Sequence, residues 1–151
     1  MPTTVRAMAR ADIPAVAGLW AQYAYRSVFR DTVPVDPVHL SGNLRGLLTN
    51  PNVICLVGEY EGVVNSFLHA KIDFWLLNNR PFLSEIAMYP GEKPTHAAGL
   101  ALLRDLHRIL DERGITPRVV TYYGGLDPEK MDALLEHFGY SLGGQVMKQG
   151  F

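Results

Sequence analysis

The chain has 151 residues, with 14 Lys and Arg against 15 Asp and Glu, which gives a formal net charge of -1 at pH 7. This length fits a single domain over residues 1–151, large enough to bury a core without disulfides or a structural metal. The near-neutral charge argues against a dedicated nucleic-acid binder, which needs a basic surface. The lone Cys55 lies in an apolar run, so we expect it to fill core space.

No stretch approaches the roughly 20 apolar residues that a membrane helix requires. The first residues also lack the basic and apolar segments of a secretory signal, so we expect a cytoplasmic protein with no membrane partner. The five histidines have no ligand spacing with carboxylates or with Cys55, so the sequence predicts no metal site.

The first half of the chain predicts a strand, two helices and an antiparallel hairpin. Asp12 and Asp36 each precede a proline in the first turn of a helical pattern, which is typical of N-caps. Apolar runs on either side of Glu61-Gly62 are typical of two strands joined by a tight turn. The expected elements are a strand over 5–8, helices from Asp12 to about Phe29 and over 38–48, and strands over 53–58 and 63–72.

In the second half, strands and helices alternate. The pattern predicts a strand over 81–89, a long helix over 95–113, a strand over 118–123, a helix from 128 to about 138 and a last strand over 140–148. Alternation of this kind favours an α/β (α+β) fold, with a mixed sheet that carries helices on its faces.

Four segments, taken in their order and spacing, resemble the GNAT superfamily of acetyl-CoA-dependent N-acyltransferases over nearly the whole chain. They are residues 5–20, 57–70, 84–90 with the Leu-rich helix that follows, and 134–140. The resemblance implies a mixed, mostly antiparallel sheet flanked by helices. It also implies transfer of an acetyl group from acetyl-CoA to an amine of a small-molecule or peptide acceptor. The alternative function is a GNAT-like binding or interaction module with weak or no catalysis.

The resemblance places the acetyl-CoA pyrophosphate where the strand over 81–89 leads into the long helix. Unpaired N–H groups and the positive end of the helix dipole suit an anion there, and small residues let the backbone approach it. The alternative is an ordinary loop whose small residues serve helix packing. The residues expected to bind the cofactor here are Lys93, Pro94, Thr95, His96, Ala97, Ala98 and Gly99.

Glu85 matches the position where the family often carries its catalytic base, and we expect it to be buried beside Phe82 and Tyr89. The alternative is a strand carboxylate that faces water or pairs with an arginine. The resemblance further implies that backbone groups of Ala87 and Met88 bind the pantetheine arm and polarise the thioester carbonyl.

Leu135 stands where the family places a tyrosine that protonates the leaving thiolate, so the resemblance identifies no acid. Tyr122, Tyr123 and Tyr140 are alternatives, although each is also explained as a sheet or core aromatic. The apolar stretch 74–77 predicts either a buried segment or an exposed patch, which then lines an acceptor pocket or forms a homodimer contact.

Overall fold

The computed structural model describes residues 2–27, 34–91, 96–116, 118–122 and 128–143. Its centre is a five-stranded sheet in the order β1-β2-β3-β4-β5. Neighbouring strands are antiparallel except for β5, which is parallel to β4, so the mixed, mostly antiparallel sheet is confirmed. The strands are β1 (Thr4–Ala7), β2 (Val53–Tyr60), β3 (Val63–Phe74), β4 (Pro81–Tyr89) and β5 (Arg118–Tyr122).

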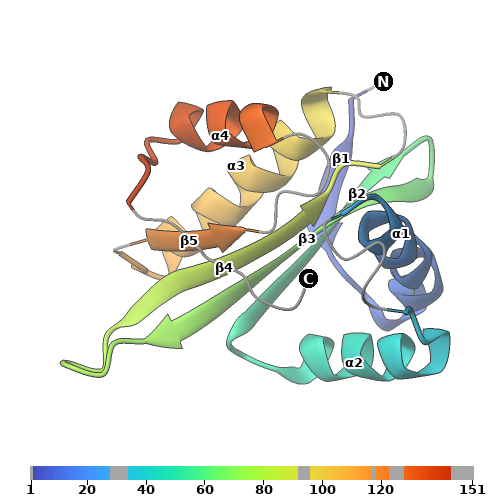
Figure 1. The fold of residues 1–151 in the computed structure, drawn as a ribbon, viewed down its shortest axis with the longest axis horizontal. Helices are drawn as coiled ribbons and strands as arrows, with labels where there is room; N and C mark the ends of the chain where they lie inside the picture. Colours follow the sequence, from blue (N-terminus) through green and yellow to red (C-terminus); the bar gives the residue numbers. More distant parts are fainter. Residues whose placement is uncertain (1, 28–33, 92–95, 117, 123–127, 144–151) are drawn as a thin grey trace.

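Two pairs of helices cover the two faces of this sheet (Figure 1). One face packs against α1 (Ile13–Arg26) and α2 (Pro37–Thr49), and the other against α3 (His96–Glu112) and α4 (Pro128–His137). Within the described ranges, no helix combines the length and the apolar character needed to cross a membrane.

The start of α2 and the turn between β2 and β3 follow the sequence prediction. The Asp36 carboxylate accepts hydrogen bonds from the backbone N–H groups of Val38 at 2.9 Å and His39 at 3.1 Å, as an N-cap does. In the turn, Glu61 and Gly62 both have left-handed φ values, 52° and 77°. A turn with this backbone matches the twist of the two strands that it joins.

Asp12 differs from its prediction. It stands at the N-cap position of α1, but its side chain makes no bond to the first turn of that helix. Its carboxylate accepts instead from the Arg6 guanidinium at 2.7 and 3.0 Å and from the backbone N–H of Ala9 at 2.7 Å. The guanidinium holds the pKa of Asp12 below its usual range. Asp12 therefore ties β1 to the short 3₁₀ turn at 10–12.

Two predicted ends are also corrected. α1 ends at Arg26, with Ser27 as its C-cap, while the predicted end near Phe29 lies outside the described residues. The strand predicted over 140–148 is wrong for 140–143, which form no strand, and the remainder lies outside the described residues.

The two faces of the sheet bury different side chains. Under α3 and α4 the buried residues are almost all aliphatic, and four leucines of α3 are fully buried. Under α1 and α2 the cluster contains the rings of Tyr23, Phe67 and Tyr89. Cys55 packs against this second cluster as expected, and burial raises the pKa of its thiol to about 11.

Candidate active site

Within the described residues, the far end of β4 has an edge with no partner strand on the β5 side. The last described pair between β4 and β5 is Ile86 with Tyr122, and within the described residues 87–89 pair with β3 alone. Unpaired strand edges present N–H and C=O groups to whatever lies beside them. The backbone of Ala87 and Met88, predicted to bind pantetheine, lies along this edge.

α3 begins at His96, so its first-turn N–H groups, including those of Ala97 and Ala98, have no partner inside the helix. Ala97 is exposed and Ala98 is buried. This arrangement fits the anion site that the sequence predicts at the start of this helix. The other predicted loop residues lie outside the described residues, and they are Lys93, Pro94 and Thr95.

Two glycines near this helix start have structural reasons for being small. A Cβ on Gly99 would lie 3.3 Å from Leu134 Cδ2 and 3.5 Å from Met88 Cε, which favours the packing alternative at this position. Gly91, treated from sequence only as a strand end, has φ +92°, and a Cβ there would lie 2.5 Å from the carbonyl oxygen of Asn65. Gly91 therefore directs the chain out of β4.

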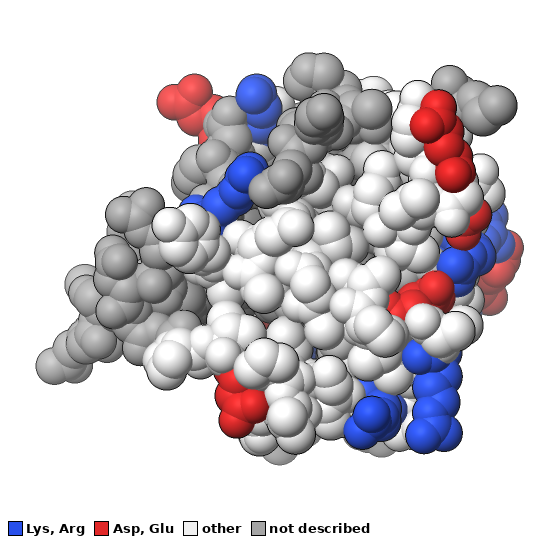
Figure 2. All heavy atoms as spheres, turned by 90° about the vertical axis from the view of Figure 1, so that its right-hand side faces the viewer, with Lys and Arg blue, Asp and Glu red and all other residues white. Residues whose placement is uncertain are grey.

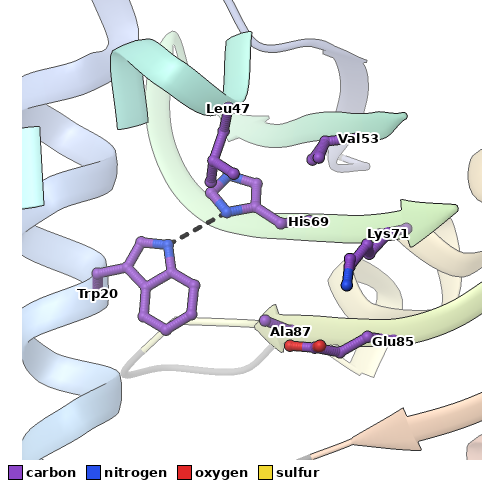
Figure 3. A pocket seen from close by; sticks show the side chains of 8 residues that line it. Trp20, Leu47, Val53, His69, Lys71, Glu85 and Ala87 are labelled. Atoms are coloured by element: carbon purple, nitrogen blue, oxygen red, sulfur yellow. Dashed lines mark hydrogen bonds between the residues drawn. The ribbon is translucent and has the colours of Figure 1, made fainter. Parts of the chain in front are cut away.

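A pocket of about 240 Å³ opens between α1, α2 and the aromatic face of the sheet (Figure 3). Glu85 lines it and is half-buried, so the expected burial beside Phe82 and Tyr89 is wrong. Phe82 stacks on Trp75 instead, with ring centroids 4.3 Å apart. The residues that line the pocket are Trp20, Leu47, Val53, His69, Ala70, Lys71, Glu85 and Ala87.

His69 is the buried polar residue of this pocket, only 6% exposed. The indole N–H of Trp20 donates to its Nδ1 at 3.3 Å, and the Trp20 ring stacks on Phe67. Because an indole nitrogen can only donate, Nδ1 carries the lone pair and Nε2 carries the proton. Nε2 is buried and has no hydrogen-bond partner among the residues that the structure describes. Burial lowers the pKa of His69 to about 4, so the ring is neutral at pH 7.

Lys71 and Glu85 add one charge of each sign to the pocket. They are register partners across β3 and β4, two register positions along from His69 and Ala87. The Lys71 ammonium lies 3.2 Å from Asp73 in an exposed ion pair, a type that contributes little stability. Glu85 has no ion pair or hydrogen bond within the described part of the chain. The same part assembles no group of three or more side chains that could hold a metal ion.

The sequence reasoning missed Trp20, His69 and Lys71. Trp20 was part of an apolar helix stripe, and His69 was considered only as a metal ligand. One signal in the sequence could have found two of them, because successive side chains of a strand point to opposite faces of the sheet. His69 and Lys71 therefore share one face of β3, and their register partners Ala87 and Glu85 share the same face of β4. Their meeting with Trp20 required the tertiary structure.

Tyr122 lies on β5, and its hydroxyl is hydrogen-bonded to the carboxylate of Asp132 on α4. Burial, together with this bond, raises the pKa of Tyr122 to about 12. Tyr123, the neighbouring candidate acid, lies outside the described residues.

Tyr140 belongs to the aliphatic side of the molecule. Its hydroxyl is 2.9 Å from Nε2 of His107, whose Nδ1 is 2.6 Å from the carbonyl oxygen of Leu103. Burial raises the pKa of Tyr140. Leu135, at the position of the family tyrosine, is buried in the α3 and α4 core.

Two exposed surfaces carry few charges. Leu76 and Leu77, at the tip of the β3–β4 turn, are 99% and 93% exposed, so the exposed alternative for 74–77 is confirmed, while the pocket described above is lined by none of these four residues. Figure 2 shows a largely uncharged area on the side of α1, with charged groups around it. α1 and α2 carry one charged residue each, Arg26 and Arg45. The expected homodimer stays a prediction.

No protein-family model and no curated protein sequence matches this chain. Several solved structures match its fold over nearly the full length. A ribosomal-protein-alanine N-acetyltransferase from Brucella melitensis biovar Abortus 2308 has a TM-score of 0.74 and 16% identity, with 100% of both chains covered.

Two clostridial structures are similar in the same way. A possible acetyltransferase from Clostridium difficile 630 has a TM-score of 0.75 and 14% identity, covering 100% of this chain and 98% of the other. A predicted acetyltransferase with acetyl-CoA from Clostridium acetobutylicum has a TM-score of 0.71 and 14% identity, covering 98% and 96%. The sheet order, the helices on both faces and these matches show that the chain has the GNAT acetyltransferase fold.

Proposed function

We propose that this chain is an N-acetyltransferase that moves an acetyl group from acetyl-CoA to the amine of a small-molecule or peptide acceptor. One observation carries the proposal: among the described residues, 87–89 of β4 have no partner on the β5 side, and Ala87 of this stretch lines the same pocket as Glu85, a carboxylate with no ion pair or hydrogen bond in the described part of the chain. Acyl transfer needs these two things side by side, an edge that positions the acyl donor and a base that takes the proton of the amine.

Different groups of the chain would bind acetyl-CoA and accept the proton of the amine. Acetyl-CoA, when bound, supplies the acetyl group as an activated thioester. Backbone N–H and C=O groups of Ala87 and Met88 orient the pantetheine arm, and the N–H groups at the start of α3 attract its phosphates. Glu85 binds the acceptor amine in the pocket and accepts its proton, directly or through one water molecule.

Neither of the two described candidate tyrosines has a free hydroxyl to serve as the general acid. The Tyr122 and Tyr140 hydroxyls are both engaged, with Asp132 and His107, and Leu135 replaces the family tyrosine. We therefore expect the rate to depend mainly on Glu85.

The test is a pair of matched variants, Glu85→Gln and Glu129→Gln, assayed for acetyl transfer from acetyl-CoA to a panel of amines. Glu129 is exposed on α4, away from the pocket, and serves as the control. Glu85→Gln should lower turnover by about 10²- to 10⁴-fold, the usual contribution of a general base. Its acetyl-CoA affinity and free energy of unfolding should stay near those of the parent. A tenfold or smaller loss would contradict the role of Glu85.

A second candidate is a GNAT-like binding module without efficient catalysis, and buried Leu135 favours it because it removes the family acid. Acetyl-CoA binding separates the two. At 100 times its dissociation constant, acetyl-CoA should stabilise the fold by about 2.7 kcal/mol, which a thermal shift detects. If calorimetry and thermal shift both show no interaction at millimolar acetyl-CoA, the binding-module function replaces the enzyme.

A further inference from the structure

We propose that the pocket takes, as the acetyl acceptor, a small primary amine with an apolar body and no second charged group. This inference deepens the proposed function and rests on it for the transfer step. Recognition of the amine follows from the charges and the walls of the pocket, and its test does not use acetyl-CoA.

The charges around the pocket leave one carboxylate uncompensated. Of the lining residues, Lys71 and Glu85 carry a charge at pH 7, since burial keeps the His69 ring neutral. The Lys71 ammonium already pairs with Asp73 at 3.2 Å, whereas Glu85 has no ion pair or hydrogen bond in the described part of the chain. Two carboxylates therefore accompany one ammonium, and the pocket is complementary to a ligand with a single positive charge.

Glu85 lies at one end of an apolar surface. Glu85 and Ala87 share one face of β4 and are two residues apart, which is about 6.6 Å along a strand. Figure 3 shows the Glu85 side chain directed along β4 toward Ala87, with the Trp20 ring of α1 on the far side of Ala87. Because Ala87 carries only a methyl group, it leaves room between the carboxylate and the indole. A ligand with its ammonium at Glu85 therefore places its carbon atoms over Ala87 and against Trp20.

Trp20 is a fixed wall of the pocket. Its indole N–H donates to Nδ1 of His69 at 3.3 Å, its ring stacks on Phe67 with centroids 4.9 Å apart, and Tyr23 meets it edge-on at 5.2 Å. A ring whose orientation is already set by its neighbours loses little rotamer freedom when a ligand binds against it. His69 thus acts on the ligand only through Trp20, as a positioning residue.

The remaining walls and the volume set the rest of the ligand. These walls are Leu47, Val53 and Ala70, which provide no partner for a second charge. An ammonium or a carboxylate buried against them would lose its water without gaining a hydrogen bond. The volume of about 240 Å³ is below the roughly 300–1,000 Å³ typical of sites for drug-sized ligands. The pocket therefore fits a short, branched or ring-bearing carbon chain better than an amino acid or a polyamine.

The chain contains its own reporter of this pocket. It has two tryptophans, of which Trp20 lines the pocket, while Trp75 stacks on Phe82 in the β3–β4 hairpin and does not line it. In Trp75→Phe, Trp20 is the sole tryptophan, so its fluorescence and its indole ¹H–¹⁵N signal report ligand binding at the pocket. The whole chain with this substitution is titrated at neutral pH, without acetyl-CoA.

Isoamylamine is the reference probe, and four relatives each change one property. Ethylamine lacks most of the apolar body, 3-methyl-1-butanol lacks the charge, L-leucine adds an α-carboxylate, and 1,5-diaminopentane adds a second ammonium. Isoamylamine should bind at least about tenfold more tightly than each, since each loses apolar contact, loses the ion pair or buries a charge without a partner. From n-propylamine to n-butylamine and n-pentylamine, the affinity should rise about fourfold with each methylene.

Matched variants in the same background assign the charged contact. Glu85→Gln should weaken isoamylamine binding about tenfold and leave 3-methyl-1-butanol binding unchanged. Glu129→Gln on α4 should change neither. Glu85 is half-buried, and melting temperatures confirm that its variant folds.

Two further variants test the wall. Ala87→Val narrows the space between Glu85 and Trp20, so it should weaken isoamylamine about tenfold and ethylamine much less. His69→Phe removes the acceptor of the Trp20 N–H and should weaken isoamylamine about threefold, whereas His69→Gln, which still accepts from the indole, should restore most of this loss.

The two proposals fail in different ways. Equal binding of any of the four relatives, an unchanged Glu85→Gln or Ala87→Val, or no response of Trp20 to isoamylamine overturns the amine pocket, whatever the chain does with acetyl-CoA. Selective binding of isoamylamine with the expected variant pattern but no acetylation supports the pocket, while it removes the proposed transfer.

Discussion

The two faces of the sheet differ in chemistry although the same strands build them. Along β3, Leu68, Ala70 and Ile72 point into the aliphatic core under α3, while His69 and Lys71 point to the side of α1 and α2. A period of two residues thus separates a closely packed core from a partly open site. The aliphatic face has few polar groups to satisfy, whereas the residues that line the pocket on the other face include a buried imidazole, a cation and a carboxylate.

This division suggests that stability resides mainly on one face and ligand recognition on the other. Substitutions that lower the free energy of unfolding most should be those under α3, and they should leave ligand preference unchanged. Substitutions around the pocket should alter recognition, pH dependence or local order. The predictions below examine this division, beginning with the largest expected effect.

Leu106→Ala tests the aliphatic face. Leu106 is fully buried between α3 and the sheet, so the substitution removes buried methyl groups and leaves a cavity. The free energy of unfolding should fall by about 3–4 kcal/mol, as for other buried leucines. Urea denaturation measures this loss.

The matched control is Leu77→Ala, since Leu77 is 93% exposed and should change stability by about 0.5 kcal/mol or less. If Leu106→Ala costs under about 1 kcal/mol, the aliphatic face is not the main source of stability.

The pH dependence of stability tests the pocket face through His69. Its pKa is about 4 in the folded chain against an ordinary value of 6.5, so below neutrality the unfolded chain binds a proton that the folded chain does not. Stability therefore falls as the pH drops from about 7 to about 4, and the His69 contribution to this fall is about 3 kcal/mol. The other titratable groups around the ring are Lys71, Glu85 and, on β2 opposite His69, Cys55.

The measurement is urea denaturation of the parent and of His69→Gln at about pH 7.5 and at about pH 4. His69→Gln has no group that titrates at this position, so the parent should lose about 3 kcal/mol more than the variant over this interval. Equal losses in the two chains would mean that His69 is not buried in its neutral form.

The sequence predicted those features of the fold that depend on local signals. The Asp36 cap, the turn at Glu61-Gly62, the strands β2 to β4 and the apolar stripe of α3 are each set by residues a few positions apart. Asp12 is the N-cap residue of α1 as predicted, but its side chain does not cap the helix, because Arg6 on the preceding strand competes with the helix N-terminus for the carboxylate.

The candidate site was only partly predictable. Glu85, Ala87 and Met88 came from a resemblance, and Glu85 does line the pocket. Trp20 and His69 are 49 positions apart, and neither carries a local signal of their hydrogen bond. The tautomer of His69, and with it the free N–H, depends on that contact. The pocket thus contains a pair of residues, Trp20 and His69, that only the packing of α1 on β3 brings together.

Gly91→Ala tests the segment that follows β4. This strand contributes Glu85 and Ala87 to the pocket. Gly91 has φ +92°, and a Cβ there would lie 2.5 Å from the backbone oxygen of Asn65, which cannot move as a side chain can. We expect a loss of about 2–3 kcal/mol and weaker acetyl-CoA binding, measured by denaturation and calorimetry.

Gly114→Ala is the matched control for this substitution. Gly114 also has a left-handed φ, +65°, but a Cβ there would meet nothing within 4 Å. It should cost only about 1 kcal/mol, the strain of the backbone alone. Equal losses at the two positions would mean that the contact with Asn65 does not matter.

Gly46→Ala should give the smallest effect, and it addresses the helices that cover the pocket. α2 contains Gly42 and Gly46, whereas α3 has no glycine after Gly99, so α2 is intrinsically the weaker helix. A Cβ on Gly46 would meet nothing within 4 Å. The alanine should therefore raise the free energy of unfolding by about 0.5–1 kcal/mol and the melting temperature by about 1–4 °C.

The control for Gly46→Ala is Gly58→Ala on β2, where a Cβ would lie 2.1 Å from the hydroxyl oxygen of buried Ser66. That substitution should destabilise the chain by about 1–3 kcal/mol, because the strands must move apart or Ser66 must change its rotamer. Hydrogen exchange adds a local measurement: the amides of α2 should exchange more slowly in Gly46→Ala, while those of α3 stay unchanged. Slower exchange in both helices would mean that α2 and α3 unfold locally in one cooperative step. The two faces of the sheet would then not differ in their local stability.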